Sequence, residues 1–320
     1  MPNSWDKLAK KLLLNPHGRE ALKQFGIEVE IADPKKQENK PIVVVLCPTY
    51  RSPEPQMQDA LGVMVRYTRE KDFATVYSGP PCAASVVHWS RNWMLAEHLK
   101  SGKPWTHALF IDDDIVVEPD ALERLLSHNK HIVAGLCTRR QDPPVPNIRL
   151  FDEETGKYRQ IWEWPENQLI GDNKRIGAGT GLMLVSQWAL EQIAQVYFDC
   201  LWEQETYGLS GDKLETMKKQ RLATFDSDRL CYWFRFLQAP KNSVEMGEDV
   251  SFCHLATRYC DISVYVDTSV QPGHLGSYPF GIRDFLPYRA ACVENSKGGG
   301  TKIEGDPAQS FHMTYETARA

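Results

Sequence analysis

Three adjacent carboxylates, Asp112, Asp113 and Asp114, interrupt an apolar run. The residues before them, 108–111, form a short apolar segment, which predicts a buried strand. In an open α/β sheet, ligands bind where such strands end. Because like charges repel, the triplet requires a cation or hydrogen-bond donors nearby. Asp112 and Asp114 could offer oxygen ligands to Mg²⁺ or Mn²⁺. The alternative is a solvated acidic turn.

A second acid pair and a late histidine could complete such a site. Glu248 and Asp249 open a predicted helix, where either could act as general base toward a hydroxyl. Both could instead only stabilise the helix N-terminus. His274 lies in a glycine-flanked turn and could hold a divalent ion together with Asp114, which would help a diphosphate to leave. A structural histidine is the alternative.

Positive charge and glycines add to this set. Arg139 and Arg140 follow a predicted strand and could bind a diphosphate, or they could be a solvated pair. Segment 175–185 is a glycine-rich loop that runs into a strand. Its glycines could approach a ligand closely or could only form turns.

The elements that must position these residues alternate from residue 42 onward. Strand and helix patterns follow one another to residue 136, which predicts an α/β fold with parallel strands and helices on both faces. The predicted strands are 42–50, 73–77, 106–112 and 131–136, and the helices between them are 54–70, 85–100 and 119–127. Shorter strands follow at 148–151 and 158–162, the glycine-rich loop within 175–185 runs into another, and a late strand is expected at 262–266. An aromatic strand or edge is expected at 229–237, with helices at 186–197 and from 247.

Composition divides the chain into three parts. Residues 1–40 carry an amphipathic helical pattern and a polar linker, and this extension could form a subunit contact in a homo-oligomer. Residues 41–293 form the predicted main domain, in which 199–245 is a largely helical, charged insert. Residues 294–320 are a polar tail, expected to be loose.

Several classes of protein are disfavoured. With 42% hydrophobic and 25% charged residues, the chain has a globular composition, and no apolar run reaches the roughly 20 residues of a membrane helix. The first residues lack a signal pattern, so we expect a cytoplasmic protein. The cysteines form no C-x-x-C pair, which argues against zinc or a disulfide framework. The net charge of -5 argues mildly against a general nucleic-acid surface.

The order of these motifs resembles the glycosyltransferases with the GT-A fold, the family-2-like members in particular, over about residues 42–276. The resemblance is carried by the first strand 43–50, Ser90-Arg91-Asn92, Phe110-Ile-Asp-Asp-Asp114 as a D-x-D motif, Gly177-Ala-Gly179-Thr-Gly181, Gly247-Glu-Asp249 and the segment from Tyr265 to His274. It implies a Rossmann-like, mostly parallel sheet and a nucleotide-diphosphate sugar, such as a UDP- or GDP-sugar, as donor. Segment 199–245 does not align and is the expected acceptor side.

The resemblance also implies roles for individual residues. Asp249, with Glu248, is the expected catalytic base. A Mn²⁺ or Mg²⁺ ion would be held by Asp112, Asp114 and His274, although the extra Asp113 leaves open which two acids bind it. The expected donor-binding residues are Pro48, Thr49, Tyr50, Arg91, Asn92, Asp112, Asp113, Arg139, Gly179 and Gly181. The acceptor stays open: a glycan, a lipid-linked sugar, a protein or a modified DNA base.

Three other interpretations stay open. Asp112 and Asp114 also fit the D-x-D-x-V strand of haloacid-dehalogenase-like phosphatases, although two strands precede it here. A nucleotidylyltransferase would share the architecture but needs a glycine-rich loop after the first strand, and segment 48–53 contains no glycine. A non-catalytic sugar-binding protein is the third.

Overall fold

The computed structural model describes residues 40–50, 52–141, 143–172, 175–197, 210–213, 224–226, 229–238, 245–276, 281–295 and 300–302. The predicted helical extension at 1–40 lies outside these residues, apart from Lys40. Most of the predicted insert at 199–245 also lies outside them. Among the described residues, no helix combines the length and apolar character needed to cross a membrane.

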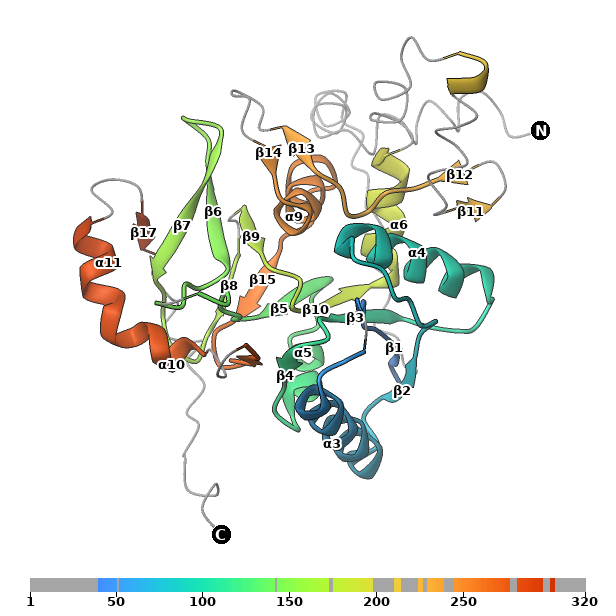
Figure 1. Ribbon diagram of the computed structural model, residues 1–320, viewed down its shortest axis with the longest axis horizontal. Helices are drawn as coiled ribbons and strands as arrows, with labels where there is room; N and C mark the ends of the chain where they lie inside the picture. The colour runs from blue at the N-terminus through green and yellow to red at the C-terminus, as the bar shows by residue number, and fades with distance from the viewer. Residues whose placement is uncertain are drawn as a thin grey trace, which may run out of the picture.

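A seven-stranded sheet forms the centre of the molecule, in the order β2-β1-β3-β10-β5-β15-β8 (Figure 1). Its strands are β1 (Ile42–Leu46), β2 (Thr75–Ser78), β3 (His107–Ile111), β5 (Ile132–Gly135), β8 (Leu169–Ile170), β10 (Leu182–Ser186) and β15 (Tyr265–Asp267). β2, β1 and β3 are mutually parallel, as are β5 and β15. β10 is antiparallel to both β3 and β5, and β8 is antiparallel to β15. Five of the seven strands therefore point the same way, which confirms the mixed α/β class with a mostly parallel sheet.

Helices cover both faces of this sheet. One face carries α3 (Pro55–Lys71) and α5 (Ala121–Ser127), and the other carries α4 (Val87–Lys100), α6 (Gln187–Val196) and α9 (Glu248–Tyr259) (Figure 1). Alternation along β1 explains this arrangement, because Val43 and Val45 pack toward α3 whereas Val44 and Leu46 pack toward α4. The sequence predicted each of these helices within a few residues.

A second sheet lies beside the first, in the order β17-β7-β6-β9. It consists of β6 (Ile148–Asp152), β7 (Lys157–Glu163), β9 (Ile176–Ala178) and β17 (Gly300–Lys302), with α10 (Ile282–Phe285), a 3-10 helix, η2 (Leu286–Tyr288), and α11 (Arg289–Asn295) beside it (Figure 1). β17 pairs with β7 in parallel. Residues 300–302 were expected in a loose tail, so this part of the expectation is wrong: their backbone groups find partners along β7.

Short strand pairs complete the described structure: β4 (Ile115–Val116) with β16 (Gly273–His274), β11 (Thr224–Asp226) with β12 (Arg229–Leu230), and β13 (Leu237–Gln238) with β14 (Glu245–Met246). The aromatic segment 229–237 was expected as one strand or edge. Only its ends are strands, β12 and the start of β13, and residues 231–236 form a loop in which the adjacent Trp233 and Phe234 are both buried instead of alternating.

Candidate functional site

The carboxyl ends of β1, β3 and β5 meet at one edge of the sheet, because these strands point the same way. The acidic triplet follows β3 directly. The backbone N–H of Asp112 donates to the carbonyl of Gly181 at 3.0 Å. This bond extends the pairing of β3 with β10 by one residue and fixes the point where the acids leave the sheet.

Asp112 and Glu248 are joined by one buried arginine. Arg91 Nη2 donates to Asp112 Oδ1 at 2.6 Å, and Arg91 Nη1 donates to Glu248 Oε1 at 3.2 Å. Arg91 is 2% exposed, so its charge depends on these two acids. Burial alone would lower the pKa of Arg91, but Asp112 and Glu248 raise it overall. Burial raises the pKa of Asp112, and Arg91 offsets part of that rise.

Asp114 and His274 form a second pair. His274 Nε2 lies 3.2 Å from Asp114 Oδ1, and His274 Nδ1 donates to the carbonyl of Thr138 at 2.7 Å. β16 pairs with β4 and thereby places His274 opposite Ile115, next to Asp114. The backbone N–H of Leu275 also donates to the carbonyl of Asp114 at 2.8 Å. Two residues far apart in sequence therefore share one rigid corner.

Asp114 and His274 fit a divalent cation. A carbonyl can only accept, so the Thr138 contact keeps a proton on Nδ1, and Nε2 could coordinate an ion that displaces the proton it shares with Asp114. Adjacent ligands of an octahedral ion, each about 2.1 Å from it, lie about 3 Å apart, close to the distance between Nε2 and Oδ1. No set of three or more His, Cys, Asp and Glu residues suited to a metal occurs among the described residues. An ion here would therefore take its remaining ligands from water or phosphate, as Mg²⁺ commonly does.

The charges around Asp114 favour its ionised form. Burial would raise the pKa of Asp114, but the hydrogen bond and charge of His274 and the charge of Arg140 lower it. Burial would lower the pKa of His274, but Asp114 and the Thr138 carbonyl raise it. Arg140 Nη1 lies 2.8 Å from Asp114 Oδ2, and its side chain is 54% exposed. Arg140 is thus a cation that can move away from Asp114.

Asp249 has a neighbour that the sequence did not single out. Asn147 Nδ2 donates to Asp249 Oδ2 at 3.4 Å, while Asp249 Oδ1 accepts from the N–H of Val250 at 2.7 Å. A Cβ atom on Gly179 would collide with the Asn147 side-chain amide, so the glycine makes room for Asn147. Asn147 lies in the proline-rich loop after Arg140, where no periodic pattern could have indicated its role.

Three of the expected donor-binding residues, Arg91, Asn92 and Asp112, make side-chain contacts within the protein. Asp112 and Arg91 are brought together with the acid pair. Asn92 is fully buried, and its amide donates to the carbonyl of Phe234 at 2.7 Å and accepts from the N–H of Phe234 at 3.0 Å. Both polar atoms of Asn92 are therefore engaged by one backbone residue, and Asn92 holds the loop at 231–236 rather than facing the site.

The other expected donor-binding residues lie around the same edge. Pro48 is buried after β1, and Tyr50 is 61% exposed. Thr49 pairs its backbone with Cys82 and Ala84 across a short bridge. The Asp113 carbonyl accepts from the N–H of Glu54 at 2.9 Å, and the backbone of Arg139 bonds to the carbonyl of Val145 at 2.8 Å. For Thr49, Asp113 and Arg139 these are main-chain contacts, which leave the side chains to other partners.

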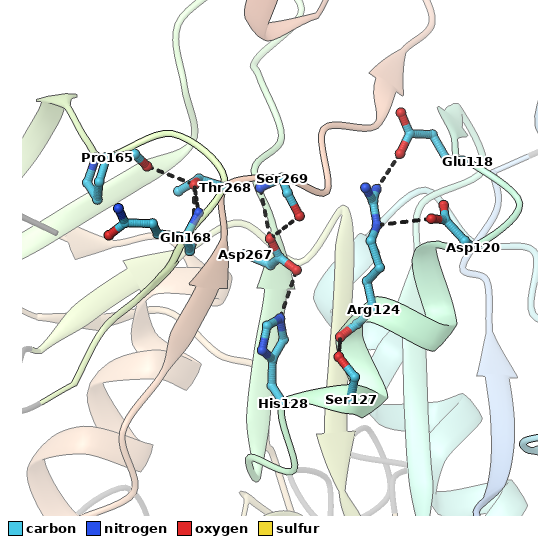
Figure 2. A network of polar contacts seen from close by, with 10 residues as sticks. All are labelled: Glu118, Asp120, Arg124, Ser127, His128, Pro165, Gln168, Asp267, Thr268 and Ser269. Carbon is cyan, nitrogen blue, oxygen red and sulfur yellow. Dashed lines mark hydrogen bonds and ion pairs between the residues drawn. The ribbon is translucent and has the colours of Figure 1, made fainter. Parts of the chain in front are cut away.

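A buried network anchors the turn that leads to His274 (Figure 2). Asp267, at the end of β15, accepts from Ser269 and meets His128 Nε2 at 2.8 Å. Thr268 Oγ1 donates to the carbonyl of Pro165 at 2.8 Å. The carbonyl of Val270 then accepts from the N–H of Leu136 at 2.8 Å. These hydrogen bonds hold residues 267–270 in place and thereby position β16 and His274, which follow them.

Comparisons with known proteins give low similarity throughout. No protein-family model matches the chain, and no curated protein matches its sequence. Among solved structures, A197 from STIV aligns at 14% identity with a TM-score of 0.36, covering 74% of this chain and 86% of that one. A glycosyltransferase involved in the glycosylation of the major capsid of PBCV-1 aligns at 14% identity with a TM-score of 0.28, covering 52% and 74%. A nucleoside-diphosphate-sugar pyrophosphorylase from Vibrio cholerae RC9 aligns at 10% identity with a TM-score of 0.29, covering 51% and 80%.

Proposed function

We propose that this protein is a metal-dependent glycosyltransferase that moves a sugar from a UDP- or GDP-sugar to an acceptor hydroxyl. The observation that carries the proposal is the corner at which Asp114 Oδ1 and His274 Nε2 lie 3.2 Å apart. Arg91 joins Asp112, two residues away, to Glu248 at the start of α9. Acids for a cation and acids for a base thus meet at one sheet edge, where α/β proteins bind ligands.

Asp114 and His274 would hold Mn²⁺ or Mg²⁺, with Asp112 beside them. The ion would supply Lewis-acid stabilisation to the leaving diphosphate. The Arg140 side chain is 54% exposed, and its Nη1 lies 2.8 Å from Asp114 Oδ2. It can turn toward a diphosphate once a cation takes its place, adding charge-assisted hydrogen bonds.

Asp249 is the better candidate for the base. Glu248 Oε1 already accepts a hydrogen bond from Arg91, so this oxygen is engaged within the protein. Asp249 Oδ1 caps its own helix through Val250, which leaves Oδ2, with its long contact to Asn147, to accept the proton of the acceptor hydroxyl. In this proposal Glu248 belongs to the Arg91 network and Asp249 removes the proton.

The phosphatase alternative has less support. It needs Asp112 as a free nucleophile, and Asp112 Oδ1 is held by Arg91 at 2.6 Å. In addition, two strands of the sheet, β1 and β2, precede β3 in the chain, whereas the D-x-D-x-V strand of such phosphatases is expected to come first. A carboxylate bonded to a buried guanidinium is a poor nucleophile because its charge is already neutralised.

The test is a thermal-shift panel of UDP- and GDP-sugars with and without Mn²⁺, because a ligand that binds only the folded state raises Tm. We expect one donor to raise Tm only when the metal is present. The matching donor is then incubated with a glycan, a lipid-linked sugar, a protein and hydroxymethylated DNA, and nucleotide release is measured. A shift with vanadate and Mg²⁺, but with no nucleotide-sugar, would contradict the proposal in favour of a phosphatase.

A further inference from the structure

Arg91 is buried between two acids from different parts of the chain. It comes from the first half of α4, Asp112 follows β3, and Glu248 opens α9. Only 2% of the arginine side chain is exposed, against 27% for Asp112 and 18% for Glu248. A donor molecule can therefore reach the acids but not the guanidinium that joins them.

An aromatic cluster packs against this arginine, and two of its three rings come from β3 and α9. We call Phe110, Phe234 and Phe252 the aromatic base. The guanidinium carbon of Arg91 lies 5.6 Å from the centre of the Phe234 ring. Phe234 stacks on Phe252 at 4.7 Å and meets Phe110 edge-on at 5.0 Å.

Each ring of the aromatic base is tied to one member of the Arg91–Asp112–Glu248 network. Phe110 precedes Asp112 by two residues on β3, so both belong to the same side of that strand. Phe252 follows Glu248 by four residues on α9, which places it one turn further on the same helix face. Asn92, next to Arg91, clamps Phe234 through two hydrogen bonds. Any shift of α4, β3 or α9 would therefore disturb both layers.

We infer that Arg91 is a positioning residue that holds Asp112 and Glu248 in one fixed arrangement, and this inference rests on the proposed function. Arg91 uses one oxygen of each acid, Asp112 Oδ1 and Glu248 Oε1. Asp112 Oδ2 and Glu248 Oε2 take no part in the contacts with Arg91, and their side chains are 27% and 18% exposed. Arg91 also cancels the repulsion between the two acids, which would otherwise force them apart. One buried guanidinium thus fixes the positions of Asp112, on the donor side of the proposed site, and Glu248, on the acceptor side.

The test compares Arg91→Lys, Glu248→Gln, the double variant and a control, Arg289→Lys. Lysine keeps the charge but lacks the fork that can span two carboxylates. Arg289 is a matched control, because its guanidinium also stacks on an aromatic ring, Trp164 at 4.8 Å, and among the described residues it donates to the backbone carbonyls of Trp162 and Trp164. Binding of UDP or GDP with Mn²⁺ is measured by calorimetry, and nucleotide release from the matching donor gives kcat and KM.

We expect Arg91→Lys to weaken nucleotide binding at least about tenfold and to lower kcat about a hundredfold, since a small misplacement costs that much. Glu248→Gln should keep nucleotide affinity within about threefold, because Asp112 remains bonded to Arg91, while kcat falls. The double variant should resemble Arg91→Lys alone, as expected for residues that act as a unit. If Arg91→Lys behaves like Arg289→Lys, with a lower Tm but unchanged affinity and kcat, Arg91 is only structural.

Melting temperatures separate this inference from the proposed function. If wild type binds neither UDP nor GDP with Mn²⁺, the proposed function fails. The Arg91 network is then judged by Tm alone. Glu248→Gln should lower Tm in wild type but not in the Arg91→Lys background, where the lysine can pair with only one of the two acids and neutralising Glu248 relieves the remaining repulsion. Equal losses in both backgrounds would overturn the inference.

Discussion

Two aspartate–histidine pairs at the same sheet edge differ in how exposed they are and in what else each carboxylate contacts. Asp267 and His128 lie 2.8 Å apart with side chains 2% and 6% exposed. Asp114 and His274 lie 3.2 Å apart with side chains 11% and 18% exposed. The residue types are identical, so the difference in chemistry must come from the other partners of each carboxylate.

Those partners are anchored in one pair and movable in the other. Asp267 Oδ1 accepts from the backbone and hydroxyl of Ser269, two residues away, so nothing can replace them without unfolding the turn (Figure 2). Asp114 Oδ2 meets Arg140, whose side chain is 54% exposed. A buried polar group with fixed partners stabilises the fold, whereas one with a displaceable partner can exchange it for a ligand. We therefore read Asp267–His128 as structural and Asp114–His274 as the candidate metal corner.

The largest effect is expected at the candidate metal corner. Asp114→Asn removes the charge that would hold the cation, so we expect no metal-dependent Tm shift with any nucleotide-sugar and at least about a 10³-fold loss of turnover. Unfolding should change little, because the partners of Asp114 are partly exposed. Thermal shift with and without Mn²⁺ checks this. Unchanged metal dependence would remove the distinction between the two pairs.

For Asp249→Asn we expect turnover to fall by about 10² to 10⁴-fold, the usual contribution of a general base, while metal-dependent donor binding persists. Asparagine retains an oxygen that can cap α9 through the N–H of Val250, so the helix and donor binding should be preserved. Calorimetry with donor and Mn²⁺, together with nucleotide release, measures both properties. Retained turnover would show that another group accepts the proton.

Asp267→Asn should affect stability and leave the donor site intact. The variant removes the charge of a buried carboxylate that accepts hydrogen bonds from His128 and Ser269, and hydrogen bonds to a charged group contribute about 2 to 3 kcal/mol. Burial would raise the pKa of Asp267, but hydrogen bonds from His128 and Ser269 lower it overall. A carboxyl with a lowered pKa contributes stability above its usual value of 3.8, and that contribution is lost as the pH falls below about 4.

Urea unfolding at pH 7 and at pH 3 measures this contribution. The difference in unfolding free energy between wild type and Asp267→Asn should be large at pH 7 and should shrink at pH 3. A metal-dependent donor shift that persists in Asp267→Asn would agree with its structural role. Loss of that shift at full stability would mean that the pair takes part in binding.

The sequence predicted the elements better than their pairing. Alternating apolar runs placed the helices and the parallel strands of the first half of the chain within a few residues. The antiparallel entry of β10 between β3 and β5 was not predicted, since an apolar run of five residues carries no direction. The strand pair β4–β16 was also missed, because two-residue strands give no periodicity. It is this pair that brings His274 to Asp114.

The polar residues were identified by type more readily than by role. Asp112, Asp114 and Glu248 were singled out because adjacent acids at element ends are conspicuous. Arg91 was expected to touch the donor, yet its burial depends on Phe234, which lies in a loop far along the chain. Tertiary contacts of this kind leave no local signal in the sequence.

The smallest effect is expected from Arg140→Gln, and it examines the movable partner directly. The exposed ion pair between Arg140 and Asp114 competes with a cation for the same carboxylate. Exposed pairs are worth at most about 1 kcal/mol, so removing Arg140 should tighten Mn²⁺ binding, measured by calorimetry without nucleotide, by about two- to fivefold. The matched change at the structural pair, His128→Gln, should leave Mn²⁺ affinity unchanged and lower Tm. Weaker Mn²⁺ binding in Arg140→Gln would mean that Arg140 orders Asp114 for the ion instead of competing with it.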